Sequence, residues 1–187
     1  MENSDNKIYN LIKFYNSELK PFRYIYKCMF GININFTIEP DQVCHLILGS
    51  VNKNIPNANE YKGIKGYNNI VSKKITKVPS QIKKEFNSKS KGFLYLPKLL
   101  ENPTAIFFNH EIVQKGNIKG LGSTDIEADF LLYKEFQNIK IHLFLKWSPN
   151  KNKLVPYSLI KNSKDKYIVN QKSIKILDKH IKIKEDL

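Results

Sequence analysis

ADFLLYKEFQNIKIHLFLKW, residues 128–147, contains the clearest β-strand pattern of the sequence. It contains two runs rich in leucine, isoleucine and aromatic residues, separated by the polar pair Gln137 and Asn138. Short apolar runs bounded by turn-forming residues are typical of β-strands. We therefore predict strands at residues 126–136 and 139–147, joined by a short connection.

Similar runs on both sides of this stretch extend the expected sheet. Residues 105–108 and 154–160 are also strand-like, and Asn, Pro and Lys occupy the short connections of the second half. Consecutive strands with short connections predict an antiparallel meander. Because the helical patterns lie in the first half of the chain and the strands in the second, we expect an α+β fold and not a βαβ wind.

The N-terminal region predicts a helix followed by a hairpin. Apolar residues recur at helical spacing over residues 5–19, where Ser4 or Asp5 can cap the helix and Pro21 can stop it. Residues 22–30 and 32–38 are rich in aromatic and β-branched residues and are separated by Gly31, which indicates a β-hairpin.

A short helix is expected directly after this hairpin. Pro40 suits the first turn of a helix that follows Glu39, and Gly49 can end it. His45 then lies in the middle of this helix, which has one apolar face.

The remaining segments predict further helices and a basic tail. We expect helices at residues 58–72, 79–86 and 94–100. Apolar residues alternate in the lysine-rich tail after Asn162, which predicts either an added strand or a partly disordered tail. The chain has no internal repeat and no long linker, so we predict a single domain over residues 1–187.

The charge balance predicts a polyanionic partner. The sequence has 31 basic against 17 acidic residues, a formal net charge of +14, and the excess is distributed over nearly every segment. Lysines that neutralise phosphates release counterions, so RNA is the expected partner. Arg23 is the only arginine, so base reading by bidentate arginine is not expected. The alternative is a basic surface that serves solubility, with codon bias adding to the lysine content.

Cysteine content and the N-terminus indicate a cytoplasmic protein. Cys28 and Cys44 match no zinc spacing and no disulfide framework, so a reducing compartment is expected. The sequence opens with polar residues and contains no stretch long and apolar enough for a signal peptide or a membrane span. We therefore expect no membrane partner.

The search for catalytic motifs leaves two candidates. No phosphate-binding loop, dinucleotide fingerprint, serine elbow or paired-cysteine pattern is present. Asp125, Glu127 and Asp129 alternate, which on a strand would place three carboxylates on one face and could hold Mg²⁺. His45 is the second candidate, since a histidine on a basic surface can transfer a proton at a ribose hydroxyl. For the acidic row, the structural alternative is a solvated strand face. For His45, it is a structural residue of the helix.

Four segments in order resemble a known nuclease group. They are HLILG (residues 45–49), ADFLLYKEF (128–136), IHLFLKW (141–147) and LVPYSLI (154–160), and the likeness spans about residues 20 to 160. Together they resemble the phage, barnase, EndoU, colicin and RelE-like nuclease group, particularly its fourth subfamily. The resemblance implies N-terminal helices and a hairpin packed on a C-terminal antiparallel sheet. It also implies a metal-independent endoribonuclease without cofactors, used as a toxin or in phage defence, with an antitoxin or immunity protein as a second partner.

The resemblance also assigns residues. His45 matches the helical histidine of the His-Leu-x-Gly pattern, although Ile47 and Leu48 lengthen the spacing to the glycine. Asp129 matches the acidic residue that opens the central strand, and Ser158 the polar residue of the closing strand.

These assignments lead to a mechanism. The RNA 2′-hydroxyl would attack the adjacent phosphate, with His45 as acid or base and Lys146 or Lys134 stabilising the phosphorane. Ser158 or Tyr157 would orient the phosphate. We expect nucleic-acid contacts on the central strands from Tyr133, Lys134, Lys140, His142 and Trp147. Tyr133 and Trp147 are either stacking platforms for bases or core residues.

Two alternatives remain open. The first is a basic nucleic-acid-binding module without catalysis. The second is a Mg²⁺-dependent nuclease built on the Asp125, Glu127 and Asp129 row, whose activity chelation would abolish.

Overall fold

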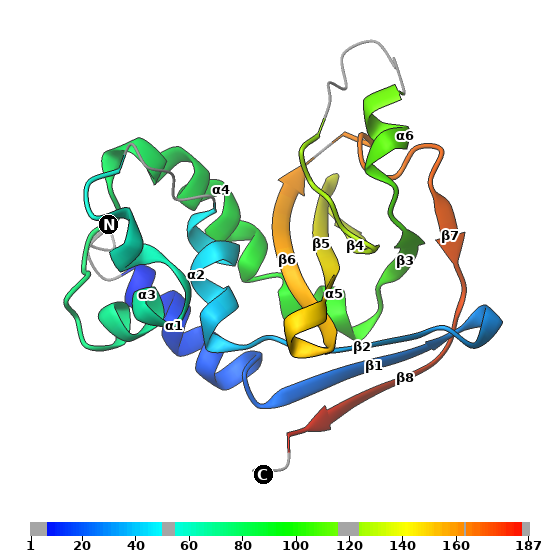
Figure 1. Ribbon diagram of the computed structural model, residues 1–187, viewed down its shortest axis with the longest axis horizontal. Coiled ribbons are helices and arrows are strands. Elements are labelled where there is room, and N and C mark those ends of the chain that lie inside the picture. The colour runs from blue at the N-terminus through cyan, green and yellow to red at the C-terminus, as the bar shows by residue number, and fades with distance from the viewer. Residues whose placement is uncertain (1–6, 50–54, 116–123, 163, 185–187) are drawn as a thin grey trace.

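The chain folds into helices and two antiparallel sheets, which confirms the predicted α+β class. The structure is a computed structural model that describes residues 7–49, 55–115, 124–162 and 164–184. Figure 1 shows the first four α-helices gathered on one side, the larger sheet on the other side, and the smaller sheet running beneath both.

The helices occupy the predicted regions with small differences in their bounds. Ser4 and Asp5, the expected caps of the first helix, lie outside the described residues. The fourth helix continues well past the predicted end at residue 86 because Phe86 and Phe93 both face the core. The α-helices are α1 (Lys7–Glu18), α2 (Pro40–Leu48), α3 (Gly63–Val71), α4 (Lys83–Phe93), α5 (Leu96–Glu101) and α6 (His110–Lys115).

The larger sheet, here the main sheet, contains the predicted meander. Its consecutive strands are β3 (Thr104–Phe107), β4 (Phe130–Phe136), β5 (Ile139–Ser148) and β6 (Lys153–Asn162), and β7 (Lys172–Ile174) is added beside β3. The described strands lie in the order β6-β5-β4-β3-β7. Strand β6 is therefore an edge strand, and its outer side meets the helices.

The smaller sheet, here the hairpin sheet, joins the two ends of the described chain. The predicted hairpin forms β1 (Phe22–Cys28) and β2 (Asn33–Thr37), and β8 (Ile176–Ile183) pairs antiparallel with β1. The added-strand alternative for the tail is thus confirmed over β7 and β8. The hairpin is not only packed on the main sheet, as expected, but forms a sheet of its own.

The two faces of the main sheet have different surroundings. On β5, Ile141, Leu143 and Leu145 face the large core that helices, hairpin sheet and main sheet share. The intervening Phe144 faces a smaller core that contains Leu131 and Tyr167. Among the described helices, none is long and apolar enough to cross a bilayer.

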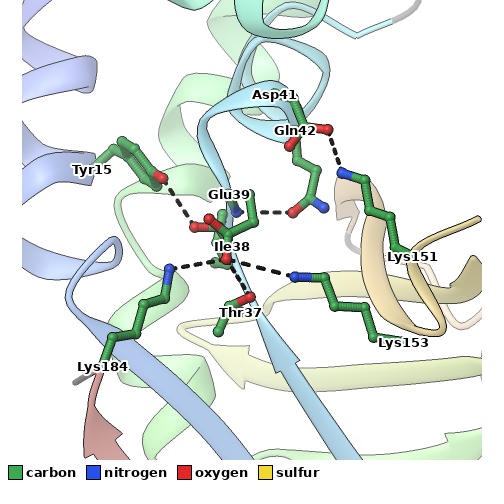
Figure 2. Close-up of polar contacts among 9 residues, drawn as sticks. All are labelled: Tyr15, Thr37, Ile38, Glu39, Asp41, Gln42, Lys151, Lys153 and Lys184. Atoms are coloured by element: carbon green, nitrogen blue, oxygen red, sulfur yellow. Dashed lines mark hydrogen bonds and ion pairs between the residues drawn. The ribbon is translucent and has the colours of Figure 1, made fainter. Parts of the chain in front are cut away.

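Glu39 connects three parts of the fold, as Figure 2 shows. Its carboxylate accepts a hydrogen bond from Thr37 at 2.5 Å and one from Lys184, just beyond β8, at 3.1 Å. Lys153 of the main sheet lies 3.8 Å away. Burial alone would raise the pKa of Glu39, but these hydrogen bonds and lysine charges outweigh it, so the pKa lies below its usual 4.5.

The neighbouring contacts fix the start of α2 at the same place. Glu39 is the N-cap of α2 and forms a capping box with Gln42, whose side chain accepts the Glu39 N–H at 3.0 Å. The Tyr15 hydroxyl donates to the carbonyl of Ile38 at 2.9 Å, and Asp41 pairs with Lys151. Helices α1 and α2 and both sheets are thus held together around one carboxylate.

We predict that Glu39→Gln lowers the free energy of unfolding by about 1–3 kcal/mol at neutral pH, because charge-assisted hydrogen bonds are lost. A carboxylate with a lowered pKa stabilises the fold above its unfolded-state pKa, and this contribution is lost as pH falls through the folded-state value below 4.5. Denaturant unfolding at several pH values measures both effects. Glu135→Gln, which removes only an exposed ion pair with Lys140, is the control with a small change. Equal losses in the two variants would contradict the role of Glu39.

Candidate functional site

A hollow of about 320 Å³ lies between α2, α4 and the edge strand β6. It contains two of the predicted catalytic residues, His45 from α2 and Ser158 from β6. Helix α4 and residues of β6 and of the segment before β4 supply the rest of the lining, which is Glu85, Ser88, Lys89, Ile126, Leu159, Ile160 and Lys161. We refer to it as the His45 hollow.

Gly49 allows α4 to approach α2 at this hollow. It ends α2 with φ 76° and ψ −155°, a conformation that in practice only glycine adopts, and its N–H donates to the His45 carbonyl at 2.9 Å. A Cβ atom at Gly49 would lie 1.8 Å from the Glu85 carboxylate and 2.8 Å from Lys89 Cε. Glycine is therefore required at the end of the HLILG segment, because Glu85 and Lys89 approach too closely to leave room for a side chain.

Lys89 brings a buried positive charge into the hollow. The residue is 8% exposed, and its ammonium donates to the carbonyl of Leu159 at 2.8 Å and lies 3.8 Å from the Glu85 carboxylate. Burial lowers the pKa of Lys89, and Glu85 partly opposes this effect. A lysine ammonium has three donors, so two remain beyond the Leu159 contact.

His45 is held in the form that can accept a proton. Burial lowers its pKa below the usual 6.5 and the charge of Lys89 lowers it further, while hydrogen bonding to the backbone of Tyr157 raises it. A neutral imidazole has one ring nitrogen with a lone pair, which can accept a proton.

A β-bulge in β6 places Tyr157 and Ser158 next to His45. Phe144 pairs with Ser158 whereas Leu145 pairs with Pro156, so Tyr157 is the extra residue. Its ring centroid is 6.2 Å from that of His45, and the Lys146 ammonium lies 5.2 Å from the same tyrosine ring. The bulge brings together four of the predicted catalytic residues, with Lys146 at the outer end.

The fifth predicted catalytic residue, Asp129, lies elsewhere. It lines a second hollow of about 500 Å³ together with Trp147, and its carboxylate accepts the backbone N–H of Trp147 at 2.5 Å. Asp129 therefore does not line the His45 hollow, and the predicted catalytic residues are divided between two hollows.

The predicted nucleic-acid contacts on β4 and β5 do not form one surface, which corrects that prediction. His142 is 0% exposed and Tyr133 stacks on it with a centroid distance of 6.0 Å. Lys140 pairs with Glu135 at 3.2 Å and Asp165 at 2.7 Å. Strand alternation turns Lys134 to the opposite face, where it donates to the Lys98 carbonyl at 3.4 Å. Of this set, Trp147 is well exposed, at 46%.

The acidic row does not form a strand face, which corrects that part of the prediction. Strand β4 begins at Phe130, and Asp125 and Glu127 lie before it. Glu127 pairs with Lys146 at 3.2 Å. Over the described parts of the chain, no group of three or more His, Cys, Asp or Glu side chains is arranged to hold a metal ion.

Sequence reasoning missed Lys89 and Glu85. The polar run NSKSKGF (residues 87–93) ended the predicted helix at residue 86, ahead of Lys89. The missed signal is the spacing of Phe86, Ser90 and Phe93, which places one apolar and small-residue face along a longer helix. The i, i+4 spacing of Glu85 and Lys89 would then have put both on one side of it.

Comparison with known proteins adds no relative. No family model, no curated protein and no solved structure matches the chain.

We predict that Gly49→Ala costs about 1–3 kcal/mol through backbone strain and also raises the pKa of His45. The added Cβ displaces Glu85 and Lys89, and moving the lysine charge away favours the imidazolium. Proton NMR titration of His45 measures the shift. Gly31→Ala is the matched control, because Gly31 also has a positive φ of 71° but no described atom lies within 4 Å of its Cβ position. The same His45 pKa in both variants would contradict the close approach at Gly49.

We predict that His142 makes the fold sensitive to mild acid. Burial lowers the pKa of His142 from 6.5 to about 4, and the nearby backbone of Ile160 only partly opposes this lowering. Among the described residues, neither ring nitrogen has a hydrogen-bond partner. A histidine with a lowered pKa stabilises the fold above its unfolded-state pKa. That stability, about 2–4 kcal/mol, is lost as pH falls from 6.5 to about 4. His142→Phe should lack this loss in denaturant unfolding, whereas the exposed His180→Gln should keep it. Parallel pH curves for wild type and His142→Phe would be the contrary result.

Proposed function

We propose that the chain is a metal-independent endoribonuclease of the phage, barnase, EndoU, colicin and RelE-like nuclease group. The observation that carries the proposal is the His45 hollow, where a histidine with a lowered pKa, a buried lysine and a serine line one cavity. Perturbed titratable groups that meet in a cavity are typical of catalytic sites. The net charge of +14 supports RNA as the substrate class.

The proposed reaction uses His45 as general base. Its unprotonated ring nitrogen takes the proton of the RNA 2′-hydroxyl while that oxygen attacks the adjacent phosphorus. The bond from phosphorus to the 5′ oxygen breaks, and a 2′,3′-cyclic phosphate and a 5′-hydroxyl strand are released. Lys89 stabilises the charge on the phosphorane and gives a proton to the departing 5′ oxygen.

Two roles in the proposed reaction differ from those expected from the sequence. Lys134 lies on the other face of the sheet and Lys146 pairs with Glu127, so Lys89 replaces them as the cation at phosphorus. Ser158, 8% exposed in the lining of the hollow, is the hydroxyl that orients the phosphate. Tyr157, the bulged residue of β6, lies beside His45.

A second candidate function has its own supporting observation. Lys89 donates to the Leu159 carbonyl, and His45 hydrogen-bonds to the backbone of Tyr157, so both side chains satisfy groups on the outer side of an edge strand. Such contacts also suit a basic RNA-binding module in which His45 and Lys89 are purely structural. The two functions differ in cleavage and not in binding.

We expect the purified chain to cleave a labelled single-stranded RNA in EDTA, and His45→Ala to lower the rate by about 10²- to 10⁴-fold, since a general base contributes that much. Lys89→Gln should lower it by a similar factor of about 10² or more. Gel analysis of the products, including a test for the cyclic phosphate end, measures both effects. Because the pKa of His45 lies below 6.5, activity should persist at pH 6.5 and fall in more acidic buffer as the imidazole becomes protonated.

His180→Ala, which changes an exposed histidine on β8, is the matched control and should cleave at the wild-type rate. RNA binding without cleavage by the wild type would favour the binding module. Cleavage that requires added Mg²⁺ would favour the metal-dependent alternative. Equal cleavage by wild type and His45→Ala would refute the proposed role of the histidine.

A further inference from the structure

The second hollow, which contains Trp147, has the composition of a site for a flat aromatic ligand. It lies where β3 and β5 end and β4 and β6 begin, against the hairpin strand β2. Its volume of about 500 Å³ is in the range of small-molecule sites, roughly 300–1,000 Å³. Four aromatic and three polar residues characterise the lining, namely Phe107, Phe108, Phe130, Trp147, Asn33, Asn109 and Asp129.

The aromatic rings leave an unusual amount of stacking surface uncovered. Phe107 and Phe130 pack together with a centroid distance of 5.6 Å and form one wall. Trp147, the sole tryptophan of the sequence, is 46% exposed at the rim. Large aromatic side chains gain most when their faces are covered, so an aromatic hollow with an exposed indole suits a planar guest.

Polar groups around the hollow favour a nucleobase over a purely apolar guest. Asp129 Oδ2 accepts the Trp147 N–H at 2.5 Å, which fixes the orientation of the carboxylate and leaves its second oxygen available as an acceptor at the hollow. A carboxylate accepts hydrogen bonds from the amino group of a base. The Lys172 ammonium lies 5.7 Å from the Phe107 ring, where it can meet a phosphate attached to the same nucleotide.

We propose that this hollow binds an unpaired, amino-bearing nucleobase of a single-stranded nucleic acid, with Trp147 stacking on the base and Asp129 accepting its amino group. Adenine, guanine and cytosine carry such a group, and uracil does not. The inference rests on the proposed function in that RNA is the expected source of the base, but it does not require cleavage.

The two hollows lie near one another along β5. Lys146 precedes Trp147 on β5, its ammonium lies 5.2 Å from the Tyr157 ring, and the centroid of that ring lies 6.2 Å from that of His45. Side chains alternate between the faces of a strand, so Lys146 and Trp147 point to opposite sides of β5 and the base site is separate from the proposed cleavage position.

The test uses the tryptophan fluorescence of the full chain, excited selectively over the ten tyrosines, which reports on this hollow because Trp147 is the sole tryptophan. We expect saturable quenching by GMP, AMP and CMP, with at least about fivefold weaker binding of UMP, which lacks the amino donor. Asp129→Asn should reduce this preference to about twofold or less, because one acceptor oxygen becomes a donor. In anisotropy titrations of a labelled oligonucleotide, Trp147→Ala should weaken binding by about 10- to 100-fold.

Matched variants separate this site from the proposed cleavage. Leu94→Ala, which removes an exposed apolar side chain outside the hollow, should leave oligonucleotide binding unchanged. Quenching of the wild type without cleavage supports the base site even where the nuclease proposal fails. Absence of quenching by all four nucleotides, or equal binding of UMP and GMP, overturns the inference, even where the chain cleaves RNA.

Discussion

The fold depends on one partly buried carboxylate. Glu39 caps α2, accepts hydrogen bonds from Thr37 and from Lys184 beyond β8, and faces Lys153 at the start of β6. These partners come from the hairpin, the C-terminal region and the main sheet, so the ionised side chain fixes the relative positions of all three. The same residue sets the first turn of α2, and the direction of α2 determines where His45 points one turn before Gly49.

Local sequence patterns were sufficient for most of the fold. The meander followed from the apolar runs between residues 126 and 160, and α2 from Pro40 and Gly49. The pairing of β8 with β1 could not be predicted, since no local property of residues 176–183 identifies a partner strand more than a hundred positions earlier. The length of α4 was underestimated because its polar residues conceal the two phenylalanines that bury one face.

The candidate site was predictable only in part, for a similar reason. His45, Tyr157 and Ser158 were identified as candidates, and the bulge in β6 places them together. Lys89 became a candidate because it is buried beside His45. Burial is a tertiary property, and the local sequence does not identify it for one lysine among many. His142 shows the opposite error: it was predicted to contact nucleic acid, but its ring is 0% exposed and packs against Tyr167.

The late pairing of β8 also has a consequence for biosynthesis. Strand β1 leaves the ribosome more than a hundred residues before β8, the strand that covers its outer edge. During that interval the hairpin presents unpaired backbone groups to other chains, which is a known hazard for nascent β-structure. Assembly of the Glu39 cluster also waits for Lys184, so the native arrangement around α2 is completed only after that residue has been synthesised.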